Sequence, residues 1–114
     1  MAEKIKLVQG DNLPNIKLTL TDPTTGLPIN LSDAQTVVRV YFRAVGSSTV
    51  LATIVCEKVN GGTNGQVRFN FSSGVLDVEP GPYEGEVEID FDGYVQTIYD
   101  LLKFTVRKQV SSTT

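Results

Sequence analysis

The sequence predicts an all-β fold in which antiparallel strands build two packed sheets. Between Tyr83 and Asp92, apolar residues alternate with acids at almost every position. A period of two places these two kinds of side chain on opposite faces of a strand. Similar short runs recur about every ten to fifteen residues with turn-forming residues between them, and no stretch keeps a helical period. This spacing is typical of a β-sandwich or barrel.

Alternation also predicts the first three strands. Residues 4–8 form a short strand that ends where the turn-forming residues after Val8 begin. Apolar residues at 16, 18 and 20 alternate with polar ones and give the second strand. In the third strand, apolar residues at 38, 40 and 42 alternate with Arg39, Tyr41 and Arg43.

Turn-forming residues predict a loop between the second and third strands. Pro23 suits position i+1 of a turn and Gly26 suits a positive φ, so residues 21–28 are expected to form a loop. Residues 31–34 are expected to form one helical turn, with Ser32 or Asp33 as its cap.

The middle of the chain adds two more strands. Residues 50–56 are rich in β-branched side chains and predict a strand that ends at Cys56, whose thiol we expect to be buried and inert. Residues 60–65 form a glycine-rich hairpin loop, and a strand over 67–71 follows it. Residues 72–82 then cross over, with a short turn at 74–76, to the acidic strand.

Asp92-Gly93 is the strongest hairpin signal, because a type I′ turn needs positive φ at both central residues. The turn pairs Phe91 with Tyr94, and the same register would place Asp100 opposite Gly85 on the apolar face. Burying that carboxylate would be costly, so we expect a bulge or loop at 99–101 before the last strand ends in Leu102, Phe104 and Val106.

The predicted fold is therefore an immunoglobulin-like antiparallel β-sandwich of about seven strands. Residues 1–110 are expected to form this single domain, with a disordered tail at 111–114.

Composition excludes several function classes. The net charge of −3 and the pI near 4.8 argue against binding to nucleic acid, and no apolar run has the length of a membrane span. The N-terminus lacks the apolar stretch of a signal peptide, so we expect synthesis in a cytoplasm without export of the chain by itself. One cysteine excludes a disulfide within the chain. The absence of histidine argues against an enzyme, and we expect no catalytic residue, metal or cofactor.

The acidic strand places five carboxylates on its expected solvent face, and three interpretations stay open: a charged surface ladder, a site for a hard cation, or an electrostatic docking face. Alternate residues on one strand lie roughly 7 Å apart, which is too far to converge on one ion without loops. The neighbouring strands would supply cations that match these acids in sign: Arg39, Arg43, Lys103 and Arg107.

Two interpretations are open for Tyr41, Tyr94 and Tyr99: a contact patch, because tyrosine is enriched in interfaces, or ordinary tyrosines scattered over the surface. Tyr83, which follows Gly81-Pro82, is instead expected to be a corner tyrosine with its hydroxyl bound to nearby backbone. The candidate interaction face comprises Arg39, Tyr41, Arg43, Glu84, Glu86, Glu88, Tyr94 and Tyr99.

Motifs along nearly the whole chain, from Val8 to Val106, resemble those of one family in their order. They are Gln9-Gly10-Asp11-Asn12-x-Pro14, Gly26-x-Pro28-Ile29-Asn30-Leu31-Ser32-Asp33-Ala34, Gly65-x-Val67-x-Phe69, Gly81-x-Tyr83-x-Gly85-Glu86-Val87-Glu88-Ile89, Asp92-Gly93 and Gln96-Thr97. Together they resemble the N-terminal domain of phage baseplate upper proteins.

The resemblance implies an immunoglobulin-like module of a phage particle that acts by assembly with other virion proteins, as a trimer or larger homo-oligomer. It implies no catalytic residues. The stalk and receptor-binding regions of that family are not among these 114 residues, which leaves open a part of a longer protein or a standalone component of the tail, neck or capsid surface. The alternative function is a carbohydrate-binding or cell-surface adhesion module, which the absence of tryptophan and the small number of tyrosines weaken.

Overall fold

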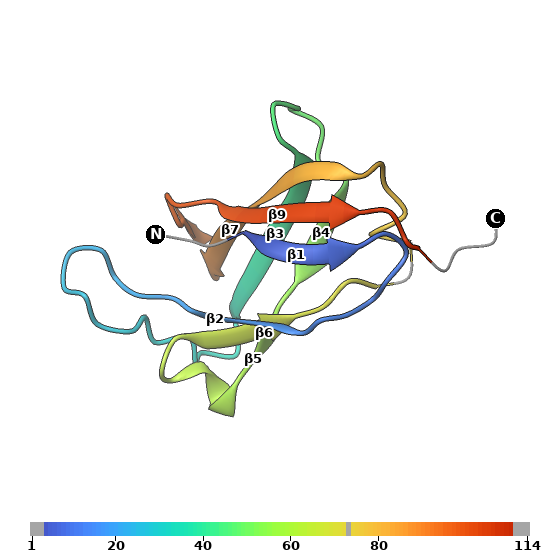
Figure 1. Ribbon diagram of the computed structural model, residues 1–114. Coiled ribbons are helices and arrows are strands. Elements are labelled where there is room, and N and C mark those ends of the chain that lie inside the picture. The colour runs from blue at the N-terminus through green and yellow to red at the C-terminus, as the bar shows by residue number, and fades with distance from the viewer. Residues whose placement is uncertain (1–3, 73, 111–114) are drawn as a thin grey trace.

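Nine strands form two sheets that pack against each other, as the computed structural model shows for residues 4–72 and 74–110 (Figure 1). One short 3-10 turn, η1, lies between two of the strands in this part of the chain. The elements are β1 (Ile5–Val8), β2 (Ile16–Thr19), β3 (Thr36–Ala44), β4 (Ala52–Val55), β5 (Glu57–Lys58), η1 (Asn60–Gly62), β6 (Gln66–Phe69), β7 (Gly81–Phe91), β8 (Tyr94–Thr97) and β9 (Leu102–Arg107).

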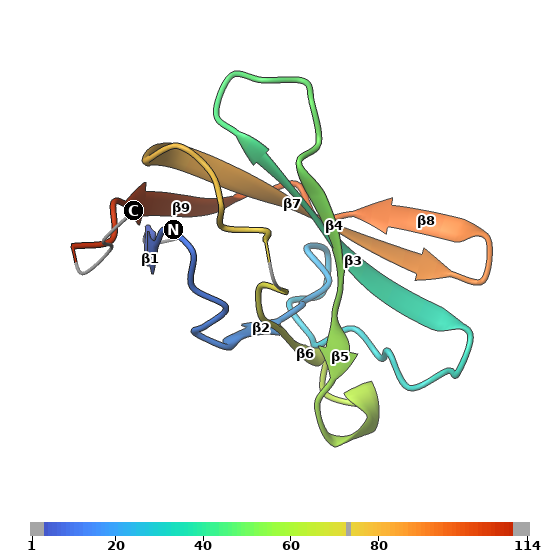
Figure 2. The same cartoon turned by 90° about the vertical axis from the view of Figure 1, so that its right-hand side faces the viewer.

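The larger sheet has the order β1-β9-β7-β3-β4, with β8 also paired to β7, and the smaller sheet has the order β2-β6-β5 (Figure 2). This order matches an immunoglobulin-like sandwich, so the predicted fold class is confirmed. One pairing departs from the antiparallel expectation, because β1 runs parallel to β9.

The described residues form nine strands rather than about seven, because at two places the chain forms two strands where one was predicted. Of the predicted strand 50–56, residues 52–55 form β4 and pair with β3; beyond the predicted end at Cys56 the chain continues as β5, which pairs with β6. The chain thus changes sheets at Cys56, whose N–H donates to the carbonyl of Val38 at 2.8 Å. The Cys56 thiol is buried as expected, and burial raises its pKa to about 12.

The second division lies between β8 and β9. The hairpin register is confirmed, with Phe91 opposite Tyr94, and the Ile98 N–H continues it by donating to the Val87 carbonyl at 2.8 Å. A loop then resets the register, so that Leu102 rather than Asp100 lies opposite Gly85. Asp100 is exposed in that loop, which confirms the expected interruption at 99–101.

An aromatic cluster fills the space between the sheets. The Phe42 ring stacks on Tyr83 with centroids 5.2 Å apart and meets Phe104 edge-on at 5.5 Å. Gly85 makes this packing possible, because a Cβ there would lie 3.0 Å from the Phe104 ring. The Tyr83 hydroxyl donates to the carbonyl of Glu79, which confirms the corner tyrosine.

Two predictions in the connections have different outcomes. The expected helical turn at 31–34 is wrong: Asp33 accepts the N–H of Gln35 at 2.8 Å and forms a non-helical turn, while Leu31 is buried in the core. The short turn at 74–76 is confirmed, since the Asp77 N–H donates to the Gly74 carbonyl at 3.2 Å. The expected tail at 111–114 lies outside the described residues.

Candidate interaction face

The outer face of the larger sheet gathers six of the eight candidate residues on the two longest strands. Antiparallel pairing of β3 with β7 sets basic or phenolic side chains directly opposite acids. Cross-strand partners of this kind have Cβ atoms about 5 Å apart and therefore interact. The pairs are Arg39 with Glu88, Tyr41 with Glu86, and Arg43 with Glu84.

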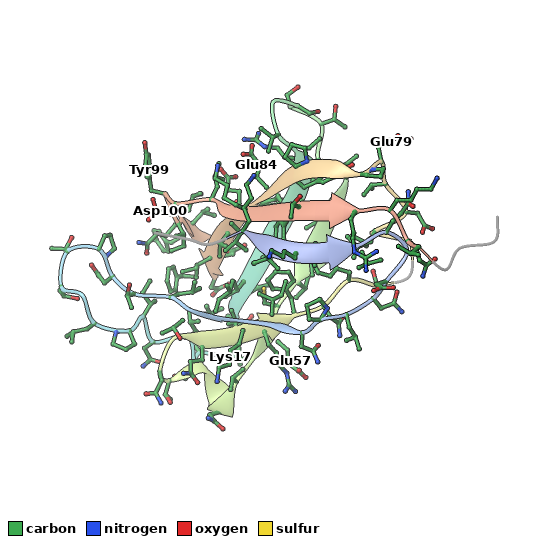
Figure 3. All side chains as sticks on the ribbon, viewed as in Figure 1. Lys17, Glu57, Glu79, Glu84, Tyr99 and Asp100 are labelled. Carbon is green, nitrogen blue, oxygen red and sulfur yellow. The ribbon has the colours of Figure 1, made fainter. Side chains whose placement is uncertain are left out.

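Glu84 is the most enclosed of the acids, and the expectation that it faces solvent is wrong. Its side chain is 8% exposed, because two cations from the neighbouring strands close over it. Both Nε and Nη2 of Arg43 lie 2.8 Å from Glu84 Oε2, and Lys103 Nζ lies 3.8 Å from Oε1. The cost of burying a carboxylate in such a place is offset because it is paired and hydrogen-bonded. Figure 3 shows Glu84 between β7 and β9.

Arg39 forms the second cluster of this face. Its Nη1 lies 3.4 Å from both Glu88 Oε1 and Asp90 Oδ2, while the Tyr41 hydroxyl donates to Glu88 Oε1 at 2.8 Å. This hydrogen bond to a carboxylate raises the pKa of Tyr41. The pKa of Asp90 is lowered, first because Asp90 Oδ1 accepts the backbone N–H of Gly93 at 2.8 Å and second because Arg39 is near.

The remaining charges divide between the face and the loops. Glu86 is exposed and has no ion-pair partner among the residues that the structure describes. Asp92 is not on the face, because it occupies the hairpin turn with a φ of 57°. Arg107 binds the carbonyl of Lys108 instead of an acid of β7. The acidic strand is thus a ladder whose acids are largely neutralised by the adjacent strands.

Tyr94 and Tyr99 lie apart from this ladder. Tyr94 begins β8 and is 81% exposed, and Tyr99 is 95% exposed in the loop that precedes β9. Figure 3 shows Tyr99 pointing away from the sandwich beside Asp100. Six of the eight candidate residues therefore share the charged sheet face, while Tyr99 lines a groove at its margin and Tyr94 lies at the start of β8.

The loop that carries Tyr99 separates two open grooves. One groove lies over the charged face, next to Arg43, Glu86 and Lys103. The other has a volume of about 590 Å³ and lies between this loop and the segment that follows β2, next to Leu20 and Pro23.

Two exposed valines at sheet edges were not among the residues that the sequence singled out. Val55 on β4 is 64% exposed, and Val95 on β8 is 57% exposed. Each lies in an uncharged run at the rim of the larger sheet. The absence of charge around Val55 and Val95 could have identified them from the sequence, since sheet edges commonly carry lysine, proline or a bulge.

Within residues 4–72 and 74–110, no three acidic or cysteine side chains are grouped so that they could hold a metal ion. No helix in the same ranges has the length and apolar character that crossing a membrane requires. No protein-family model matches the chain, and no curated protein matches it with significant similarity.

Proposed function

We propose that this chain is a structural protein of a phage particle, in the tail, baseplate or another surface component, and that it acts by assembly with other protein subunits. The proposal begins from the motifs that resemble the N-terminal domain of phage baseplate upper proteins. The immunoglobulin-like strand order is the fold that this resemblance implies. Because a fold hosts many functions, the further support for this function comes from the surface of the domain.

The observation that carries the proposal is the position of the large exposed apolar side chains. Val55, Val95 and Tyr94 lie on strands at the rim of the larger sheet, and Tyr99 lies in the loop after β8. An open sheet edge that lacks charge is a template for pairing with another chain. Exposed tyrosine and valine beside such an edge supply the apolar area that an interface core needs.

The charged ladder fits the same role as an orienting surface. Glu84, Glu88 and Asp90 are paired with arginines of β3, so most of the negative charge of this face is balanced. Glu86 and the groove beside it are the open part of the face, where a partner with basic groups would find a free carboxylate.

Two measurements test the proposal. Particles purified from the bacterium that carries the gene should contain this chain when their proteins are identified by mass spectrometry. Light scattering of the purified chain should give a trimer or larger ring. Particles that lack the chain would remove the virion role, whatever the chain does in solution.

One observation favours a second function, a carbohydrate-binding or adhesion module. The exposed Tyr99 ring stands at the rim of the 590 Å³ groove, beside the polar groups of Asp100 and Gln96. An aromatic ring next to converging polar groups is a common arrangement in ligand sites. A glycan array tests this function: binding that is lost on Tyr99→Ala would favour it, and no binding by the native chain would remove it.

A further inference from the structure

The strand edges of this protein differ in charge. Every edge of the smaller sheet, and the β1 edge of the larger one, carries at least one charged residue: Lys6 on β1, Lys17 on β2, and Glu57 with Lys58 on β5. The other two rims of the larger sheet, β4 and β8, carry none. Residues 49–55 and 94–99 are also free of charge, proline and glycine. Natural proteins protect sheet edges with charged side chains and proline, so these two rims lack the protection that the other edges carry.

The free side of β4 presents the backbone groups of Thr53 and Val55. In the antiparallel ladder, Cys56 donates to Val38 and Ile54 lies opposite Val40, so the even-numbered residues of β4 bond to β3. Alternate residues of a strand direct their N–H and C=O groups to opposite sides. Those of Thr53 and Val55 therefore point away from β3, where no other described strand lies.

The free side of β8 is built in the same way. The two-residue turn makes Phe91 and Tyr94 a bonded pair, and the Ile98 bond to Val87 keeps that phase. The backbone groups of Val95 and Thr97 therefore point away from β7. Their side chains, like those of Thr53 and Val55, lie on the outer face of the sheet, opposite Asp90 and Glu88 of β7.

These two rims match each other when β4 of one copy runs antiparallel to β8 of another. Thr53 then lies opposite Thr97 and Val55 opposite Val95, which gives one hydroxyl pair and one valine pair on the same face. Threonine pairs and β-branched apolar pairs are both favourable across strands. The pairing covers the two most exposed valines of the strands. The outward N–H and C=O groups of these two valines and of the two threonines would form hydrogen bonds with the partner strand. We propose that copies of this chain assemble head to tail by pairing β4 of one copy with β8 of the next.

An open groove lies beside each of these two strands. Figure 2 shows the β7–β8 hairpin projecting from one end of the larger sheet, away from the β4 rim. On the inner side of β4, a groove of about 310 Å³ runs past Ile54 and is lined by Asn15 and Asn70. Gln96 of the incoming strand would lie opposite Ile54 and enter this polar groove. No two like charges are brought opposite each other on either face.

The inference rests on the proposed assembly role and names the surface that performs it. A head-to-tail contact leaves β8 free on one copy and β4 free on the other, so further copies add until they close into a ring or grow as a filament. A contact between two β4 strands would instead stop at a dimer. The two arrangements are separable by experiment.

The test uses two prolines at positions that the fold tolerates. The N–H groups of Thr53 and Thr97 point out of the sheet, so Thr53→Pro and Thr97→Pro remove a donor for the partner without removing a bond within the chain. Light scattering should find each folded variant at the monomer mass of 12.4 kDa. An equimolar mixture should recover a species of twice that mass, since each variant retains the rim that the other lacks.

A second pair of variants covers the case in which a proline disturbs folding. Val55→Lys and Val95→Lys place a charge on each rim and should also give monomers that complement each other. Val45→Lys is the matched control: Val45 is similarly exposed but lies in a turn, so that variant should assemble like the native chain.

Assembly that survives Thr97→Pro and Val95→Lys would overturn the inference, as would folded variants that stay monomeric when mixed. The result also separates this inference from the proposed function. A native chain that is monomeric in solution yet present in particles refutes the strand pairing and leaves the virion role. A chain that assembles through these rims but is absent from particles does the reverse.

Discussion

Replacing Arg43 with glutamine should destabilise the fold through the carboxylate that Arg43 covers. Arg43→Gln leaves the Glu84 side chain, which is 8% exposed, with Lys103 at 3.8 Å as its remaining cation. Removing one partner of a fully buried ion pair costs ~3–5 kcal/mol, whereas exposed pairs are worth ~0–1 kcal/mol. Arg43 is 36% exposed and Lys103 is 46% exposed, so water screens part of the effect. We expect a loss of about 2 kcal/mol in the free energy of unfolding.

Chemical denaturation followed by circular dichroism measures this loss. For a chain of this size, 2 kcal/mol corresponds to a fall in Tm of roughly 6–12 °C. The matched control is Arg39→Gln, because Arg39 contacts two carboxylates at 3.4 Å that are 22% and 27% exposed. That control should lose about 0.5–1 kcal/mol.

A double variant separates the charge from the packing. Arg43→Gln combined with Glu84→Gln removes the enclosed negative charge as well as its partner, so it should be more stable than Arg43→Gln alone. Equal losses for Arg43→Gln and Arg39→Gln, or a double variant that shows the sum of the two single losses, would refute the reasoning.

Three further predictions concern the core. Gly85→Ala adds a methyl group 3.0 Å from the Phe104 ring and should lower the free energy of unfolding by about 1–3 kcal/mol in urea titrations; unchanged stability would contradict the close packing. Tyr83→Phe removes the hydroxyl that binds the Glu79 carbonyl and should cost about 1 kcal/mol in the same assay, while a gain in stability would argue against the corner role. Folding raises the pKa of the Cys56 thiol from 9.0 to about 12, so the thiol stabilises the fold fully below pH 9 and this contribution is lost as the pH rises from 9 to about 12. The free energy of unfolding should therefore fall over this pH range, and Cys56→Ala should make that fall smaller. A pH profile of Cys56→Ala identical to that of the native chain would contradict this contribution of the thiol.

Most of the fold could be predicted because each strand has its own two-residue alternation. The hairpin register followed from two residues, since Asp92-Gly93 admits one tight turn and that turn fixes the pairs between β7 and β8. The interruption near Asp100 could also be predicted, because extending the register would have buried a carboxylate.

The features that could not be predicted depend on residues far apart in the sequence. Residues 50–56 look like one complete strand, and the switch from β4 to β5 at Cys56 is decided by which strands lie on each side of it in space. The burial of Glu84 has the same origin: Arg43 is 41 positions away, and nothing in the local alternation distinguishes Glu84 from Glu86. Six of the candidate residues lie together on β3 and β7, whereas the positions of the two tyrosines outside these strands depend on the course of the loops.

The parallel pairing of β1 with β9 determines how the domain would respond to mechanical tension. The ladder joins Ile5 with Phe104 at one end and Val8 with Arg107 at the other. Because the strands are parallel, a force that enters before Ile5 and leaves after Arg107 pulls them in opposite directions along their length. The four residue pairs are then loaded in shear together instead of opening one after another. A module joined through its two ends to a contracting or vibrating assembly would resist stretching at this ladder first.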